Sequence, residues 1–226
     1  QISGNWQVSP DHELCFQIVN NRNGNDEDIY PTGLPEGTAK AKIPFMYTVN
    51  WNSYYLDKSL QLRYATAVGQ QTRKRYSYYF TCGNTYEKGP LLTYLDVMYT
   101  RQGIDQHGVV SRLPETPHTA MNTEYLSIIG DVDYRVHPQW NVYVKGAYET
   151  ARVYKGNGDF RKGMYRRSWN AQSSVEFFPF KQLDLFVFVL YTYRGVILEK
   201  AATRMGAIEP DTHRISLGLV YSIPVF

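Results

Sequence analysis

The chain has 226 residues and a formal charge of +3, and its 24 basic and 21 acidic residues are mixed along the length. This distribution excludes the clustered positive charge of a nucleic-acid-binding protein, and no window reaches the roughly 18 uncharged apolar residues that a transmembrane helix needs. With 43% hydrophobic residues, 15% aromatic residues and 20 tyrosines, the composition is typical of a β protein. The two cysteines, Cys15 and Cys82, match no metal spacing and are interpreted as reduced and structural.

Apolar and polar residues alternate in eleven segments, which predicts an all-β chain without helices. The predicted strands are 2–8, 13–21, 42–54, 59–70, 74–86, 90–101, 122–136, 139–153, 164–178, 182–195 and 212–226. The first segment, ISGNWQV, has the weakest pattern. The alternative is that it forms a loop or an inner segment, which would leave ten strands in a small closed barrel.

The connections alternate between tight turns and longer polar links. The turns are 9–12, 55–58, 87–89, 137–139 and 179–182, and the long links are 22–41, 102–121, 154–163 and 196–211, with 70–74 as a short exception. Pro, Gly and Asp favour such turns. Short turns at one rim and long loops at the other are typical of bacterial outer-membrane barrels. We therefore predict an antiparallel transmembrane β-barrel, with 1–226 as a single barrel domain.

Residue parity separates the two faces of each predicted strand. In 164–178 one face includes Trp169, Val175 and Phe177, and the other face is wholly polar. Alternation alone also fits a soluble β-sandwich whose apolar face is inside. However, Trp and Tyr gather at the ends of the apolar faces, and these faces carry no charge mid-strand. Both features favour an apolar face turned toward lipid and a polar face turned toward water.

With this orientation, charged side chains of both signs are predicted to line the pore. They are Arg63, Asp96, Asp131, Asp133, Arg135, Lys145, Glu149, Arg166, Glu176 and Arg194. Charged rings determine which ions pass, so this near balance predicts weak selectivity. Asp131 and Asp133, with Arg135 two residues further on, are interpreted either as a constriction or as part of a ladder of ion pairs that holds the strands in register.

Strand 182–195 departs from the general pattern. It places Phe186, Phe188 and Leu190 on the face that should meet water. Something other than water is therefore expected to cover part of that face. An inward-folded loop, a plug or a neighbouring subunit could do so.

The reactive residues give little indication of catalysis or of metal binding. The five histidines occur singly, and His213 lies three residues before Ser216, an odd spacing that puts the two on opposite faces of a strand. Asp26, Glu27 and Asp28 offer oxygen donors for calcium, but their spacing does not match the EF-hand pattern. We favour a solvated acidic loop and expect no metal and no cofactor.

The number of strands also predicts the directions in which the first and last strands cross the membrane. If the tight turns are periplasmic, the last strand runs downward, and counting back eleven strands makes the first run downward as well. Gln1 would then lie at the outer surface. Single-chain bacterial barrels have an even number of strands, so the chain is expected to lack at least one upward strand.

Several segments resemble one known family. They are ELCFQIVNNRNG, GLPEGTAKAKIPFMYTVNWN, LQLRYATAVGQQ, WNVYVKGAYETARVYKG and the terminal HRISLGLVYSIPVF. They are similar to the C-terminal half of Bacteroidota porins of the phosphate-selective porin O and P family. The resemblance implies a larger barrel of roughly sixteen or more strands, often trimeric. Phosphate selectivity is not carried over with it, because the predicted lumen is not dominated by Arg and Lys.

The sequence therefore predicts an outer-membrane porin for passive diffusion of small hydrophilic solutes or ions, and not an enzyme. The alternatives are a small outer-membrane barrel that acts as an enzyme or adhesin, and a soluble ligand-binding β-sandwich. The expected partners are the lipid bilayer with its lipopolysaccharide, the outer-membrane assembly machinery, small hydrophilic solutes and further subunits of a homotrimer, with no nucleic acid. The final segment resembles the C-terminal signal that this machinery reads.

Overall fold

The computed structural model describes residues 1–20, 45–72, 75–103, 122–156, 161–180, 185–199 and 210–221. Within these ranges the chain forms eleven strands and no helix. The strands are β1 (Ile2–Ser9), β2 (His12–Asn20), β3 (Phe45–Tyr55), β4 (Leu60–Thr72), β5 (Arg75–Lys88), β6 (Leu91–Gln102), β7 (Asn122–His137), β8 (Trp140–Lys155), β9 (Gly163–Phe177), β10 (Leu185–Leu198) and β11 (Thr212–Tyr221). The predicted strands are thus confirmed, including the first. Their ends lie within three residues of the predicted bounds, except at 222–226, which are outside the described residues.

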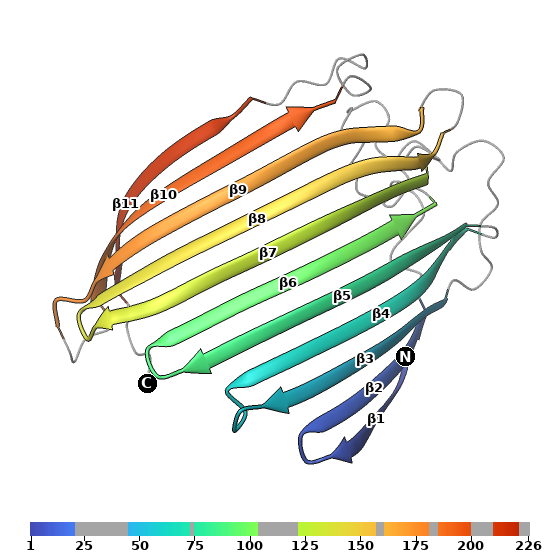
Figure 1. Cartoon of the computed structure of the whole chain (residues 1–226), viewed down its shortest axis with the longest axis horizontal. Helices are drawn as coiled ribbons and strands as arrows, with labels where there is room; N and C mark the ends of the chain where they lie inside the picture. Colours follow the sequence, from blue (N-terminus) through green and yellow to red (C-terminus); the bar gives the residue numbers. More distant parts are fainter. Residues whose placement is uncertain are drawn as a thin grey trace.

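All eleven strands belong to one sheet, and each pairs only with its neighbours in the chain. Every pairing is antiparallel. The sheet is a single curved layer with the turns β1–β2, β3–β4, β5–β6 and β7–β8 at one end (Figure 1). β1 and β11 form its two edges and do not pair with each other.

The β3–β4 turn has an unusual backbone conformation. Leu56, Asp57 and Lys58 have φ angles of 54°, 53° and 69°, a left-handed region that is costly for residues other than Gly, Asn and Asp. The Ser59 N–H donates to the Leu56 carbonyl at 3.0 Å and closes the turn. The β5–β6 turn places Gly89 at φ 58°, where glycine pays no steric cost.

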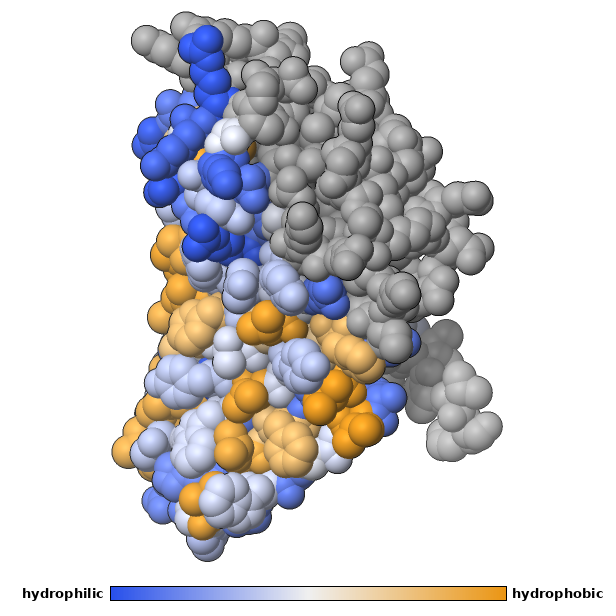
Figure 2. Space-filling model, turned by 90° about the vertical axis from the view of Figure 1, so that its right-hand side faces the viewer, coloured by the Kyte–Doolittle hydropathy of each residue, from blue (hydrophilic) through white to orange (hydrophobic). Residues whose placement is uncertain are grey.

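Burial in this sheet is the reverse of that in a soluble domain. The apolar side chains that are fully buried among the described residues are Ala151, Val153 and Tyr165, whereas many more buried side chains are polar. Large apolar residues are instead exposed, with Leu217 at 76% and Val189 at 51%. Hydrophobic residues form a band below a hydrophilic zone in the side view (Figure 2). A soluble β-sandwich would bury this surface, so the arrangement favours a sheet whose apolar face is solvated by lipid.

Candidate functional site

The strand register divides the sheet into two continuous faces. Residues that are paired across neighbouring strands share a face, and the pairings Tyr64 with Cys82, Cys82 with Val97 and Val97 with Ile128 follow one of them. We call this surface the apolar face; it also includes Tyr47, Val49, Phe80, Tyr148, Val175, Val189 and Leu217. The opposite surface, which we call the polar face, includes Asn50, Thr81, Ser127, Gln172 and Ser174. The face assignment predicted from parity therefore agrees with the observed register.

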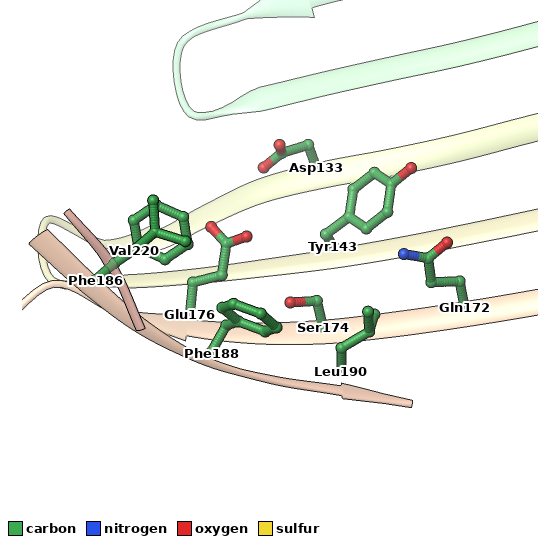
Figure 3. Close-up of a pocket in the computed structure, with 9 residues that line it drawn as sticks. All are labelled: Asp133, Tyr143, Gln172, Ser174, Glu176, Phe186, Phe188, Leu190 and Val220. Carbon is green, nitrogen blue, oxygen red and sulfur yellow. The ribbon is translucent and has the colours of Figure 1, made fainter. Parts of the chain in front are cut away.

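The polar face is the concave side of the sheet between β7 and β11. Side chains from these five strands surround one hollow with a volume of about 390 Å³ (Figure 3). Its polar lining is Asp133, Tyr143, Gln172, Ser174 and Glu176, and its apolar lining is Phe186, Phe188, Leu190 and Val220. Because five strands contribute to one hollow, the sheet curves around the polar face.

The predicted pore-lining residues lie on this polar face by their register. They are Arg63, Asp96, Asp131, Asp133, Lys145, Glu149, Arg166, Glu176 and Arg194. Arg135 sits in the register shift between Tyr134 and His137, at the turn end of β7. Its guanidinium lies 4.0 Å from the centre of the Phe178 ring and donates to the Pro138 carbonyl at 2.9 Å. Arg135 is therefore held at the rim.

One group of charged residues meets on β4, β5 and β6. The Tyr94 hydroxyl donates to the Asp96 carboxylate, and the Arg63 guanidinium lies 5.5 Å from the centre of the Tyr94 ring. Arg63 also donates to the Thr85 hydroxyl at 3.5 Å. Gly83 faces Asp96 across the strands, and a Cβ at this glycine would overlap the Asp96 carboxylate. Because Gly83 has no side chain, the Asp96 carboxylate can lie over it, next to the Arg63 guanidinium.

Opposite charges also face each other further along the sheet. Asp131 on β7 is directly across from Lys145 on β8. Glu149 accepts a hydrogen bond from the Ser168 hydroxyl at 3.4 Å. The position of Asp131 across from Lys145 is the register that a ladder of ion pairs requires. The ladder interpretation and the constriction hypothesis both stay predictions.

The apolar residues of β10 on the polar face are partly covered by the chain itself. Phe186 stacks on Phe178 with ring centres 5.0 Å apart, and Phe188 lies over Gly218 on β11. The rest of their surface faces the hollow. Cover by a loop, a plug or a neighbouring subunit stays a prediction. The contacts with Phe178 and Gly218 were not predicted, because cross-strand register cannot be read from one strand.

Charged side chains on the apolar face gather near the ends of β6 to β10 away from the short turns. Tyr99 donates to Glu124 at 2.8 Å, and Glu124 forms a 2.8 Å ion pair with Arg152. Arg167 and Glu199 form a second ion pair. These charges lie at the strand ends, which leaves the middle of the apolar face uncharged, as predicted.

Within the described ranges, neither the candidate pair of His213 and Ser216 nor a metal-binding cluster is formed. His213 pairs with Tyr193 on the apolar face, whereas Ser216 pairs with Leu190 on the polar face, so the two cannot form a dyad. No group of three or more His, Cys, Asp or Glu side chains that could hold a metal occurs in the described part of the chain. The candidate calcium loop with Asp26, Glu27 and Asp28 lies outside that part.

Cys15 and Cys82 are both free. Cys15 is paired with Asn50 on the polar face, and Cys82 is paired with Tyr64 on the apolar face. Their placement on opposite faces and on separate strands is consistent with the predicted reduced state.

In the described ranges, no helix is long and apolar enough to cross a membrane.

Comparison with solved structures identifies the class of fold. The sheet is similar to the outer membrane channel DcaP of Acinetobacter baumannii, with a TM-score of 0.59 and 11% identity over 98% of this chain and 61% of that chain. It is also similar to in-vitro folded OmpT, an outer membrane protein of Vibrio cholerae, with a TM-score of 0.53 and 11% identity over 97% of this chain and 62% of that one. The chain thus spans about three fifths of each solved chain. Together with the two faces, this similarity defines the fold as that of an antiparallel β-barrel.

A family model then identifies the relatives of the chain more closely. The chain belongs to the phosphate-selective porin O and P family, whose model matches residues 1–223. Comparison with curated protein sequences gives no match. The predicted family resemblance and the outer-membrane location are therefore confirmed.

Proposed function

We propose that the chain forms part of the wall of a water-filled outer-membrane channel through which small hydrophilic solutes and ions diffuse passively. The observation that carries this proposal is the separation of one sheet into an exposed apolar face and a concave polar face that carries charges of both signs. Water can solvate charged side chains on the concave side, while lipid solvates the exposed apolar side. Membership in a porin family supports the same function.

In the proposed channel, solutes and ions diffuse along the charged wall and no reaction is catalysed. Its charged side chains include both Arg63 and Asp96 in one group and Asp131 across from Lys145. Cations and anions would both find complementary charge along such a wall, so selectivity should be weak. The phosphate preference in the family's description is accordingly not part of this proposal.

Additional strands are proposed to close the sheet between β1 and β11. Both edges are open in the described strands, and a spanning sheet in lipid must satisfy its backbone groups by closure. The similar solved chains are longer than this one.

The family resemblance further implies a Bacteroidota source and a homotrimer. Crosslinking in native outer membranes tests the trimer.

Two adjacent residues of β9 test the orientation of the wall. Asn170 is exposed on the polar face, and Ala171 is exposed on the apolar face. Each is changed to Cys in full-length protein in which Cys15 and Cys82 are Ser, and each variant is treated with a positively charged methanethiosulfonate during planar-bilayer recording. Modification of Asn170→Cys should lower the conductance. Ala171→Cys faces hydrocarbon and should not respond.

The outcomes separate the proposal from its alternatives. Absence of conductance from correctly folded protein, shown by heat-modifiable migration on a detergent gel, would contradict a channel and favour an adhesin or enzyme. An open channel in which only Ala171→Cys responds would show that the two faces are assigned the wrong way round.

A further inference from the structure

The hollow on the polar face combines carboxylates with an aromatic wall (Figure 3). Asp133 and Glu176 reach it from β7 and β9, while Phe186 and Phe188 line it from β10. Among the lining residues that the structure describes, none is Lys or Arg. We infer, on the basis of the proposed channel function, that this hollow is a binding subsite for an organic cation that carries an apolar or aromatic group.

Glu176 is positioned by a buried neighbour. The Nδ2 atom of Asn141, a residue only 7% exposed, donates to Glu176 Oε2 at 3.2 Å. The other amide atom, Asn141 Oδ1, is buried without a hydrogen-bond partner among the described residues. A carboxylate and an unsatisfied acceptor therefore lie next to each other. The contact with Asn141 positions the Glu176 carboxylate, which accepts hydrogen bonds from a ligand N–H donor and has none to offer to an anion.

Ser174 adds a third oxygen to the same wall. It is 6% exposed, and its side chain points into the hollow between Glu176 and Leu190 (Figure 3). A serine hydroxyl both donates and accepts hydrogen bonds, so on the wall of the hollow it can contact a ligand. It lies on the same side of the hollow as the carboxylate.

The aromatic wall already interacts with one cation. Phe178, Phe186 and Phe188 form a row, with ring centres 5.0 Å and 6.3 Å apart along it. The guanidinium of Arg135 lies over Phe178, at the outer end of this row. Ring faces attract cations, and the inner end of the row is open to the hollow. A ligand cation there would meet the rings and the carboxylates together.

The size of the hollow also fits a small organic molecule. Its volume of about 390 Å³ lies within the range of roughly 300–1,000 Å³ that is usual for small-molecule sites. Two carboxylates would repel phosphate or a ligand carboxylate at this position. A bare metal ion would leave the apolar wall unused. An alkyl- or arylammonium uses both walls.

Benzylammonium is a direct probe of this subsite. Full-length protein in planar bilayers in KCl is titrated with benzylammonium, with methylammonium (charge without ring), with benzyl alcohol (ring without charge) and with benzoate (ring with opposite charge). We expect benzylammonium to reduce the single-channel current at a concentration at least about tenfold lower than the other three compounds. Both the charge and the ring are then shown to matter.

Variants connect the block to the hollow. Asp133→Asn combined with Glu176→Gln should raise the half-blocking concentration of benzylammonium by about tenfold or more, because two charge-assisted interactions are removed. Phe188→Leu keeps the apolar volume without the ring and should raise it about fivefold. Glu149→Gln removes a carboxylate from the same face outside the hollow, and benzylammonium should still block this control.

The results distinguish this inference from the channel proposal. A conducting channel that all four compounds block equally, or whose block is unchanged in the double variant, would overturn the subsite and leave the channel intact. Absence of conductance would contradict the channel instead. In that case, calorimetric titration of the folded, detergent-solubilised protein with benzylammonium decides the subsite: binding that weakens in the double variant supports it, and no binding overturns it.

Discussion

The aromatic ring of Phe188 lies over Gly218, its direct partner on the neighbouring strand β11. A Cβ at Gly218 would stand 2.5 Å from two carbons of the Phe188 ring. Gly4 with Phe16 and Gly195 with Trp169 repeat this pairing on the apolar face. Covering a strand glycine with a cross-strand aromatic ring compensates for its missing side chain. The three pairs therefore stabilise the sheet at positions where glycine alone would weaken it.

Gly218→Ala should displace the Phe188 ring and destabilise the sheet by about 1–2 kcal/mol, because the added methyl group overpacks a filled position. Urea unfolding in lipid vesicles, followed by heat-modifiable gel migration, measures this change. Gly146→Ala is the matched control, since its Cβ would meet nothing within 4 Å. Equal losses in both variants would show that the ring contact contributes nothing.

Arg63 and Asp96 should influence ion selectivity in opposite directions. Arg63→Gln leaves the adjacent carboxylate and should shift the reversal potential in a KCl gradient toward cation preference, whereas Asp96→Asn should shift it toward anions. Tyr94→Phe removes the hydroxyl that donates to Asp96 without changing charge, and it should leave the reversal potential close to that of the wild type. Shifts of the same sign in the two charge variants would contradict a shared position on the lumen wall.

Val189→Arg should oppose insertion into the bilayer. Val189 is 51% exposed on the apolar face, between Val175 and Leu217. A charge at such a position near the bilayer midplane costs about 2–4 kcal/mol. Thr192→Arg, on the polar face of the same strand, serves as the control and should cost much less. The urea midpoint for folding into vesicles measures both variants, and a tolerated Val189→Arg would contradict a lipid-facing position.

Lys58→Gly should stabilise the β3–β4 turn. Lys58 has a φ of 69°, which glycine adopts without steric cost, so a net gain of about 0.5 kcal/mol is expected after the greater chain entropy of glycine is subtracted. Lys88→Gly, at the end of β5, lacks this benefit and should be neutral or destabilising. Urea unfolding of the two variants in parallel provides the measurement. Stabilisation by Lys88→Gly alone would contradict the backbone explanation.

Most of the fold could be predicted from the sequence because a period of two is a strong signal when one face meets lipid. That signal positioned β9 and separated Ser173 from Ser174, although the two side chains are identical. The same signal failed to explain β10, where apolar residues occur on both faces. Phe188 is accommodated by Gly218, which lies 30 positions further along the chain. In the sequence of β11 nothing indicates that this glycine faces an aromatic ring.

The candidate site was less accessible to sequence reasoning. Parity placed Asp133 and Glu176 on the polar face, but it could not show that they share a hollow with Phe186 and Phe188. That proximity depends on the curvature of β7 to β11, which arises from the sheet as a whole. The Arg63 and Asp96 group likewise depends on Gly83, whose significance appears only once β5 and β6 are in register.

The strictly sequential pairing of the strands makes the sheet modular. Each strand forms its ladders only with the strand before it and the strand after it, so a two-stranded hairpin such as β7–β8 can be removed or duplicated without crossing any other connection. The remaining strands would keep their direction, and their turns would stay at the same rim. Pore diameter could therefore change in steps of one hairpin, with barrel circumference set by how many such units a gene encodes.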